Sequence, residues 1–257
     1  MSRVVRLAVA WTTRPTVAPT SRSCVAAARA AALPGPPEVP VVHLVRHGQA
    51  SFGSEDYDRL SELGREQSLV VGAALAARGL RSPVVVSGTL RRQRDTAALA
   101  VASLAEPVPA VSGPSASGPS VALDGRWDEY DHLGLLKRYA PGRTATDSRE
   151  MQVLLDAALE AWIDDPAGDW AAFSGGAVAA LAALDLPAGR HAVVFTSGGV
   201  IAAVCGHLLG LGTAGVVALN RVAVNGAITK LAIGSRGTTL VTFNEHAHLD
   251  ATSTTYR

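Results

Sequence analysis

Three short apolar runs, each ending in polar and glycine residues, constrain the fold of this chain most. They are 41–45 (VVHLV), 84–87 (VVVS) and 191–196 (HAVVFT). Runs of this length that are rich in β-branched residues are typical of strands buried on both faces of a parallel sheet. Stretches with helical spacing lie between them, and strands that alternate with helices predict a sheet covered on both faces. We therefore expect a three-layer α/β/α domain with a mainly parallel central sheet.

The signals around these strands predict the helices and an antiparallel edge. Ser61 is suited to cap a helix that ends at about Arg78, and Gly79 is suited to terminate it. The expected helices are 61–78, 90–104, 147–165, 174–184 and an apolar one that begins at Gly199. The last two apolar segments, 227–234 and 238–244, flank a turn at Gly237 and predict a β-hairpin at the edge of the sheet.

The N-terminal segment differs in composition from the rest. Residues 1–38 carry five arginines and no acidic residue before Glu38. They contain few large apolar side chains in any regular period, so we expect a disordered and dispensable extension. A targeting segment and a start codon assigned too early are the alternatives. The segment 34–40 then serves as a stiff linker into one domain over 39–257, which is interrupted by a Pro/Gly/Ser loop at 105–120.

Charge and cysteine content exclude several classes of protein. The formal net charge is +1, which favours neither nucleic acid nor a membrane surface as partner. Cys24 and Cys205 lie far apart and outside any ligand spacing, so we expect a reducing compartment, the cytoplasm. The apolar segment 198–219 is long enough to span a membrane, but glycines interrupt its second half and no cationic flank or aromatic belt marks its ends. A buried helix followed by a Gly-rich turn explains it better.

Polar residues unsuited to a core follow each of the three strands. The segments are 46–49 (RHGQ), 87–92 (SGTLRR) and 196–199 (TSGG). Ligands of parallel sheets bind beyond the carboxyl ends of the strands. A neutral imidazole such as that of His47 is a competent nucleophile if a hydrogen bond holds one ring nitrogen. The guanidinium of Arg46 offers a planar fork for phosphoryl oxygens, and Gly48 would let the backbone approach a ligand. Together they indicate phosphoryl transfer.

The order of the motifs also carries a family resemblance. VVHLVRHGQASF (41–52) resembles the Arg-His-Gly signature of the histidine phosphatase superfamily, in its phosphoglycerate mutase-like branch. RLSELGREQS (59–68), TLRRQRDTA (89–97), DGRWDEYD (124–131) and SGGVIAAVCGHLLG (197–210) resemble its further motifs, in the family's order. The resemblance covers about residues 40–250 and implies a phosphoglycerate mutase-like fold.

The same resemblance implies roles for individual residues. His47 takes the phosphoryl group, Arg46 and Arg92 bind it, and Glu129 donates a proton to the leaving oxygen. The register of the second arginine motif selects Arg92 rather than Arg91. Glu129 lies in a cluster with other acidic residues, so a solvated acidic loop is the alternative interpretation of this segment.

One position departs from the family pattern. The last motif normally reads His-Gly-Gly, and this chain has Ser197 where the family has its second histidine. The hydroxyl of Ser197 and the backbone N–H of Gly198 at the start of a helix are the expected phosphate-binding donors there. Serine supplies no imidazolium charge, so the site loses electrostatic stabilisation unless another group replaces it.

These observations favour a phosphoester hydrolase that acts through phosphohistidine on His47, without a cofactor or a metal ion. The pair His246 and His248 lacks a third ligand at a recognisable spacing, although its segment resembles a C-terminal family element that brings a histidine such as His248 near the site. Two alternatives stay open: phosphoglycerate mutase-type transfer, and a weakly active or inactive phosphoester-binding module because of Ser197. The expected partner is a small phosphorylated substrate or a phosphoprotein, with the oligomeric state open.

Overall fold

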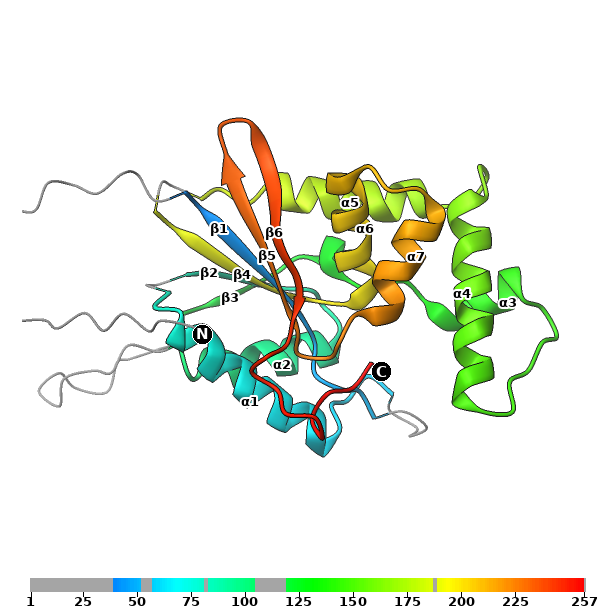
Figure 1. Ribbon diagram of the computed structural model, residues 1–257, viewed down its shortest axis with the longest axis horizontal. Helices are drawn as coiled ribbons and strands as arrows, with labels where there is room; N and C mark the ends of the chain where they lie inside the picture. The colour runs from blue at the N-terminus through cyan, green and yellow to red at the C-terminus, as the bar shows by residue number, and fades with distance from the viewer. Residues whose placement is uncertain (1–38, 52–56, 81–82, 105–118, 187–188, 257) are drawn as a thin grey trace, which may run out of the picture. The chain divides into compact units, whose positions relative to one another are not determined.

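The computed structural model describes residues 39–51, 57–80, 83–104, 119–186 and 189–256. Within this part of the chain, one sheet has the strand order β3-β2-β4-β1-β5-β6 (Figure 1). The strands are β1 (Val41–Arg46), β2 (Val84–Ser87), β3 (Val121–Leu123), β4 (His191–Thr196), β5 (Ile228–Gly234) and β6 (Gly237–Glu245). The first four in the sheet are parallel, and β5 and β6 add an antiparallel edge. The expected fold class is confirmed, whereas the short β3 was not expected.

Helices cover both faces of this sheet. Adjacent residues of a strand point to opposite faces, so Leu44 and Val45 of β1 contribute to different cores. The core of Val45 and Phe195 includes side chains of α1 (Glu62–Ala77) and α2 (Arg91–Val101). The core of Leu44 includes side chains of α5 (Trp170–Ala182) and α6 (Gly198–Leu209). This arrangement, visible in Figure 1, makes the three layers that the strand pattern predicts.

The first helix begins and ends as its sequence indicates. The Ser61 hydroxyl accepts a hydrogen bond from the backbone N–H of Gly64 at 3.0 Å, which satisfies one of the free N–H groups at the helix start. At the other end Arg78 is the C-cap, and Gly79 follows with a φ of +68°. Only glycine adopts this conformation without steric cost.

The Gly-rich turn that we expected after the buried helix α6 is short, and a further helix that was not expected follows it. Gly210, with a φ of +62°, ends α6, and Gly212 is the N-cap of α7 (Thr213–Val222). Val216 and Val217 of α7 are buried. A glycine inside a helix costs only about 1 kcal/mol, and burial of two valines offsets that cost. Within the described residues, no helix combines the length and the apolar composition needed to cross a membrane.

Two helices pack together beyond the end of the sheet, and we call α3 (His132–Tyr139) and α4 (Ser148–Asp164) the cap helices. Helix α4 corresponds to the helix predicted over 147–165, whereas α3 was not predicted. Asp131 caps α3 by accepting from the N–H of Leu133, and Asp147 caps α4 by accepting from the N–H of Glu150. Buried apolar residues hold the pair against α7, and aromatic rings surround Trp162 with centroids 5.1 to 5.4 Å away. Figure 1 shows the cap helices at the far end of the sheet.

Two expectations fall outside the described residues. The proposed extension at 1–38 is one, and the loop at 105–120, of which 105–118 is not described, is the other. The domain boundary at residue 39 therefore stays a prediction.

Candidate active site

The three strand ends singled out in the sequence are neighbours, because β2, β4 and β1 are adjacent in the sheet. The backbone N–H of His47 donates to the carbonyl of Thr196 at 2.9 Å. The N–H of Gly88 donates to the carbonyl of Phe195 at 3.0 Å. These bonds continue the parallel pairing past the strands and bring the three polar segments to one edge.

The imidazole of His47 is held in one orientation. Its Nδ1 lies 2.7 Å from the carbonyl oxygen of Gly48. A carbonyl oxygen only accepts, so Nδ1 carries the hydrogen and Nε2 keeps its lone pair. The Nε–H of Arg92 donates to this Nε2 at 3.1 Å. Burial, together with the cations of Arg92 and Arg46, holds the pKa of His47 well below its ordinary value. The ring is therefore neutral, with the hydrogen on Nδ1.

The glycine after His47 serves a different contact from the expected one. A Cβ on Gly48 would lie 2.2 Å from the carbonyl oxygen of Gly64. A Cβ on Gly64 would in turn lie 2.1 Å from the carbonyl oxygen of Gln49. The close approach that Gly48 allows is thus to the backbone of α1. It fixes the loop behind His47 against this helix.

Arg92 lies at the start of α2 and is 7% exposed. Its Nη1 forms an ion pair with Asp58 at 2.6 Å, and its guanidinium lies 5.8 Å from the centroid of the Tyr57 ring. Asp58 also accepts from the backbone N–H of Arg91 at 2.6 Å. The side chain of Arg91, in contrast, is 46% exposed and pairs with Asp95. The register inferred from the motif therefore matches the arginine that contacts His47.

Arg46 points its guanidinium across the end of the sheet. Its Nη1 donates to the carbonyl oxygens of Ala223 and, at 2.9 Å, of Tyr256. Its buried Nε has no hydrogen-bond partner among the described residues. Burial lowers the pKa of Arg46 from its ordinary value, yet an arginine stays charged in proteins. The guanidinium of Arg46 is thus fixed by two backbone carbonyl groups and adds a positive charge to the site.

Glu129 follows the short 3-10 turn η1 (Gly125–Trp127) and reaches the start of α6. Its Oε2 accepts from the backbone N–H of Gly199 at 3.0 Å, and its Oε1 accepts from the N–H of Tyr130 at 3.3 Å. Burial raises the pKa of Glu129, while the Gly199 N–H and the cations of Arg92 and Arg46 oppose the rise. The Gly199 N–H, which could have met a phosphoryl oxygen, is therefore engaged by Glu129.

Ser197 and Gly198 lie below the pocket rather than in its wall. Ser197 is 0% exposed, and its hydroxyl accepts from Nε2 of Gln93 at 2.8 Å. The same Gln93 nitrogen donates to the carbonyl of Trp127 at 2.9 Å. A Cβ on Gly198 would lie 3.4 Å from Nε of Arg46. The phosphate-binding roles assigned to Ser197 and Gly198 stay predictions.

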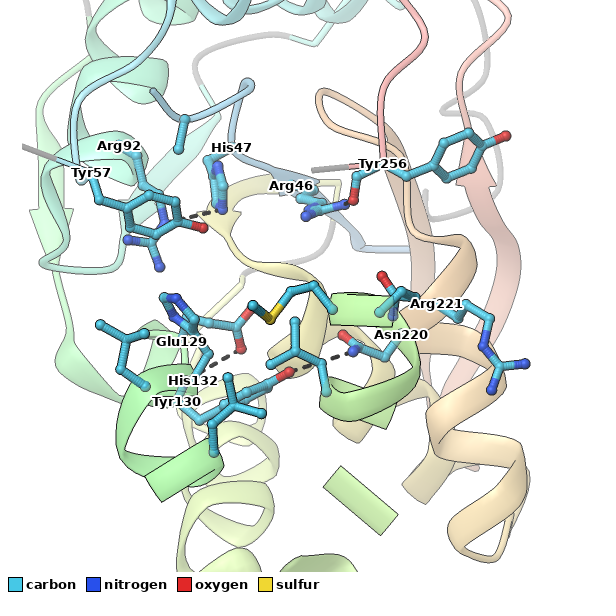
Figure 2. A pocket seen from close by; sticks show the side chains of 16 residues that line it. Arg46, His47, Tyr57, Arg92, Glu129, Tyr130, His132, Asn220, Arg221 and Tyr256 are labelled. Atoms are coloured by element: carbon cyan, nitrogen blue, oxygen red, sulfur yellow. Dashed lines mark hydrogen bonds between the residues drawn. The ribbon is translucent and has the colours of Figure 1, made fainter. Parts of the chain in front are cut away.

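The remaining candidate residues line one cavity of about 180 Å³ at this edge of the sheet. Figure 2 shows His47, Arg46 and Arg92 on one side of it and Glu129 on the other. The sequence reasoning missed several lining residues, among them Tyr57, His132, Asn220, Arg221 and Tyr256. His132 stands only three positions after Glu129, so the motif could have pointed to it. The others come from distant segments that show no pattern.

His248 is not among the residues that line the cavity. Its Nε2 lies 2.9 Å from the carbonyl of Gly226, whose N–H donates to the carbonyl of Arg46 at 3.0 Å. His248 thus supports the loop behind Arg46. Within the described residues, no group of three or more His, Cys, Asp or Glu side chains is arranged to hold a metal ion.

Comparisons with known proteins agree with this geometry. Residues 42–113 match the model of the histidine phosphatase superfamily (branch 1). The structure of mycobacterial glucosyl-3-phosphoglycerate phosphatase with inorganic phosphate is 27% identical and has a TM-score of 0.55, over 82% of this chain and 100% of that one. Its complex with VO3 is 26% identical, with a TM-score of 0.56 over 80% of this chain and 100% of that one.

Phosphoglycerate mutase from Bacillus anthracis shares the fold at 19% identity, with a TM-score of 0.54 over 82% of this chain and 96% of that one. None of the curated protein sequences matches the chain. The family match over residues 42–113 and the fold shared with solved phosphatase structures thus support the resemblance to the histidine phosphatase superfamily that the motifs indicate.

Proposed function

We propose that this chain is a phosphomonoester hydrolase that transfers the phosphoryl group to Nε2 of His47. The observation that carries the proposal is the buried His47 ring, with Nδ1 bonded to the Gly48 carbonyl and Nε2 beside the Arg92 guanidinium. An imidazole held in this tautomer is a ready nucleophile. The guanidinium of Arg92 lies next to Nε2 and would stabilise the negative charge of the bound phosphoryl group.

The reaction has two steps. Nε2 of His47 attacks phosphorus, the bond from phosphorus to the substrate oxygen breaks, and Glu129 gives its proton to that oxygen. The Glu129 carboxylate then takes a proton from water, the water oxygen bonds to phosphorus, and the phosphorus–nitrogen bond breaks. Arg46 and Arg92 hold the phosphoryl oxygens in both steps. The raised pKa of Glu129 suits the role of acid in the first step.

Two further functions compete with hydrolysis. Transfer of the phosphoryl group to a second hydroxyl, as in a mutase, uses the same residues. A phosphoester-binding module with little or no turnover is favoured by Ser197, because a fully buried serine bonded to Gln93 supplies no cation to the pocket. Similarity to glucosyl-3-phosphoglycerate phosphatase supports hydrolysis over both.

Trapping of the phosphoenzyme separates these functions. Quenching with alkaline detergent after mixing with a labelled phosphomonoester should leave an acid-labile, base-stable label on the wild type and none on His47→Gln. His207→Gln is the matched control, since His207 lies exposed in the last turn of α6. Release of inorganic phosphate with the label supports hydrolysis, and label transfer to an added alcohol supports the mutase. A wild type that binds phosphoesters but never takes up label would contradict both enzymatic functions.

A further inference from the structure

The wall of the pocket opposite His47 is apolar. Its side chains come from the cap helices, and they are Leu133, Leu136, Met151 and Leu155. Leu133 and Leu136 lie three residues apart on α3, and Met151 and Leu155 lie four apart on α4. Residues at these spacings share one helix face. Both cap helices thus turn one apolar edge toward the pocket.

Leu133, Met151 and Leu155 are distinct from the side chains that hold the cap helices together, whereas Leu136 also packs against the core around Trp162. Leu135 and Leu154, which neighbour them in sequence, are 6% and 5% exposed, and Leu135 belongs to the core around Trp162. Leu133 is 67% exposed, and Met151 and Leu155 are half-buried. Their apolar surface is therefore exposed to solvent inside a concave site. Apolar surface in such a place is typical of a ligand-binding wall.

Several polar groups near the apolar wall bond to each other. Nε of Arg221 donates to Asp156 at 2.7 Å, and Gln152 donates to the same carboxylate at 2.6 Å. The Asn220 amide reaches the Tyr130 hydroxyl at 3.5 Å. In Figure 2 the guanidinium of Arg221 points away from His47 and Arg46. The pocket thus concentrates its cations at the phosphoryl end.

We propose that the substrate is a phosphomonoester whose alcohol carries an apolar alkyl or aryl body. This inference rests on the proposed function, since the phosphoryl group lies at His47. The body then lies against Leu133, Leu136, Met151 and Leu155 and removes them from water. Burial of one methylene on an apolar wall changes an equilibrium by about fourfold. The value of kcat/KM should therefore rise about fourfold per methylene until the wall is covered.

A homologous series tests this directly. We would measure kcat/KM for ethyl, butyl and hexyl phosphate, whose alcohols are alike as leaving groups, beside glycerol phosphate and phosphoglycerate. The expected result is a steady rise from ethyl to hexyl, with both polar esters below hexyl phosphate. A flat or falling series, or a preference for phosphoglycerate, overturns the proposal and leaves the phosphatase function intact.

A pair of exposed cap-helix residues provides the variants. Leu133→Gln places an amide in the wall and should lower the hexyl-to-ethyl ratio of kcat/KM about tenfold or more. Val153→Gln is the matched control, because Val153 is 60% exposed on α4 but is not among the lining residues, and its ratio should equal that of the wild type. Equal ratios for both variants would contradict the assigned wall.

Binding provides a readout that does not need turnover. Alkylphosphonates, from ethyl to hexyl, resist hydrolysis, and calorimetry should show Kd falling with chain length in the wild type. If the affinities follow this order but no ester is hydrolysed, the apolar wall is supported and the phosphatase function fails. If the esters are hydrolysed but the Kd does not change with chain length, the assignment of the apolar wall is contradicted and the phosphatase function is kept.

Discussion

Glu129, which we propose as the proton donor, is also a structural link. Its two oxygens accept from the N–H groups of Gly199 and Tyr130, which ties the segment after η1 to the start of α6. A helix N-terminus favours the charged form of a carboxyl group, whereas burial favours the neutral form. Burial is the larger influence here, so the pKa of Glu129 is raised.

The opposite shifts of His47 and Glu129 predict the pH dependence of phosphoenzyme formation. His47 must be deprotonated, so activity is lost only as pH falls through its pKa, which lies well below 6.5. Glu129 must be protonated, so activity is lost as pH rises through its pKa, which lies above 4.5. Rapid-quench measurements at saturating alkyl phosphate should show a plateau between these limits.

In the Glu129→Gln variant, activity should no longer fall as pH rises. Its turnover of alkyl phosphates should be about 10²–10⁴-fold slower than that of the wild type. The loss should be much smaller for 4-nitrophenyl phosphate, because its leaving oxygen needs no proton. Asp131→Asn changes only the cap of α3 and serves as control. An equal loss on both substrates would contradict the role of proton donor.

At the scale of elements, the contact between β1 and α1 decides where the His47 loop lies. Gly48 and Gly64 let the loop backbone and the first turn of α1 approach each other without side chains between them. The Gly48 N–H donates to Thr96 of α2 at 3.0 Å. Two helices on one face of the sheet thus hold the loop in place.

Gly64→Ala should therefore destabilise the protein. The new Cβ would lie 2.1 Å from the backbone oxygen of Gln49, and such overpacking costs about 1–3 kcal/mol. Gly175→Ala is the opposite case, since nothing lies within 4 Å of a Cβ on that exposed helical glycine, and removal of glycine there should stabilise by about 0.5–1 kcal/mol. Denaturant unfolding measures the free energy of unfolding of both variants. An equal change in this free energy for the two variants would contradict the close contact between Gly64 and the backbone of Gln49.

At the scale of the whole domain, the site depends on residues near the end of the chain. The buried Gln67 of α1 donates to the carbonyl of Ser253 at 2.7 Å and to the Thr255 hydroxyl at 2.9 Å. The carbonyl of Tyr256 accepts from Arg46 at 2.9 Å. The C-terminal segment thus connects α1 with Arg46, the arginine that we propose to bind the phosphoryl group.

Deletion of residues 253–257 should lower both stability and activity. Gln67 and Arg46 would lose acceptors, and each buried donor left unpaired costs about 1–3 kcal/mol. A displaced Arg46 should lower kcat/KM by about 10²-fold, because small shifts of a positioning group cost this much. Thr252→Ala removes only an exposed bond to Asp250 and should behave as wild type in unfolding and turnover assays. If the truncated chain keeps the free energy of unfolding and the kcat/KM of the wild type, the site does not depend on the C-terminal segment.

The sequence alone was sufficient for the features that depend on local pattern. The β-branched runs predicted β1, β2 and β4, and Ser61 and Gly79 predicted the two ends of α1. The order of the motifs indicated the resemblance to the histidine phosphatase superfamily. The register of the second arginine motif selected Arg92, which contacts His47. The glycines of 210–215 misled the assignment of α7, because burial of Val216 and Val217 outweighs a local turn preference.

The tertiary structure decided which polar groups face a ligand and which are engaged elsewhere. Ser197 is bonded to Gln93, the Gly199 N–H to Glu129, and Gly48 packs against Gly64, none of which follows from the motif. Helix α3 and the apolar wall of the cap helices were not predicted either. Helix spacing tells which residues share a face, but the partner of that face is set by packing between segments far apart in the chain.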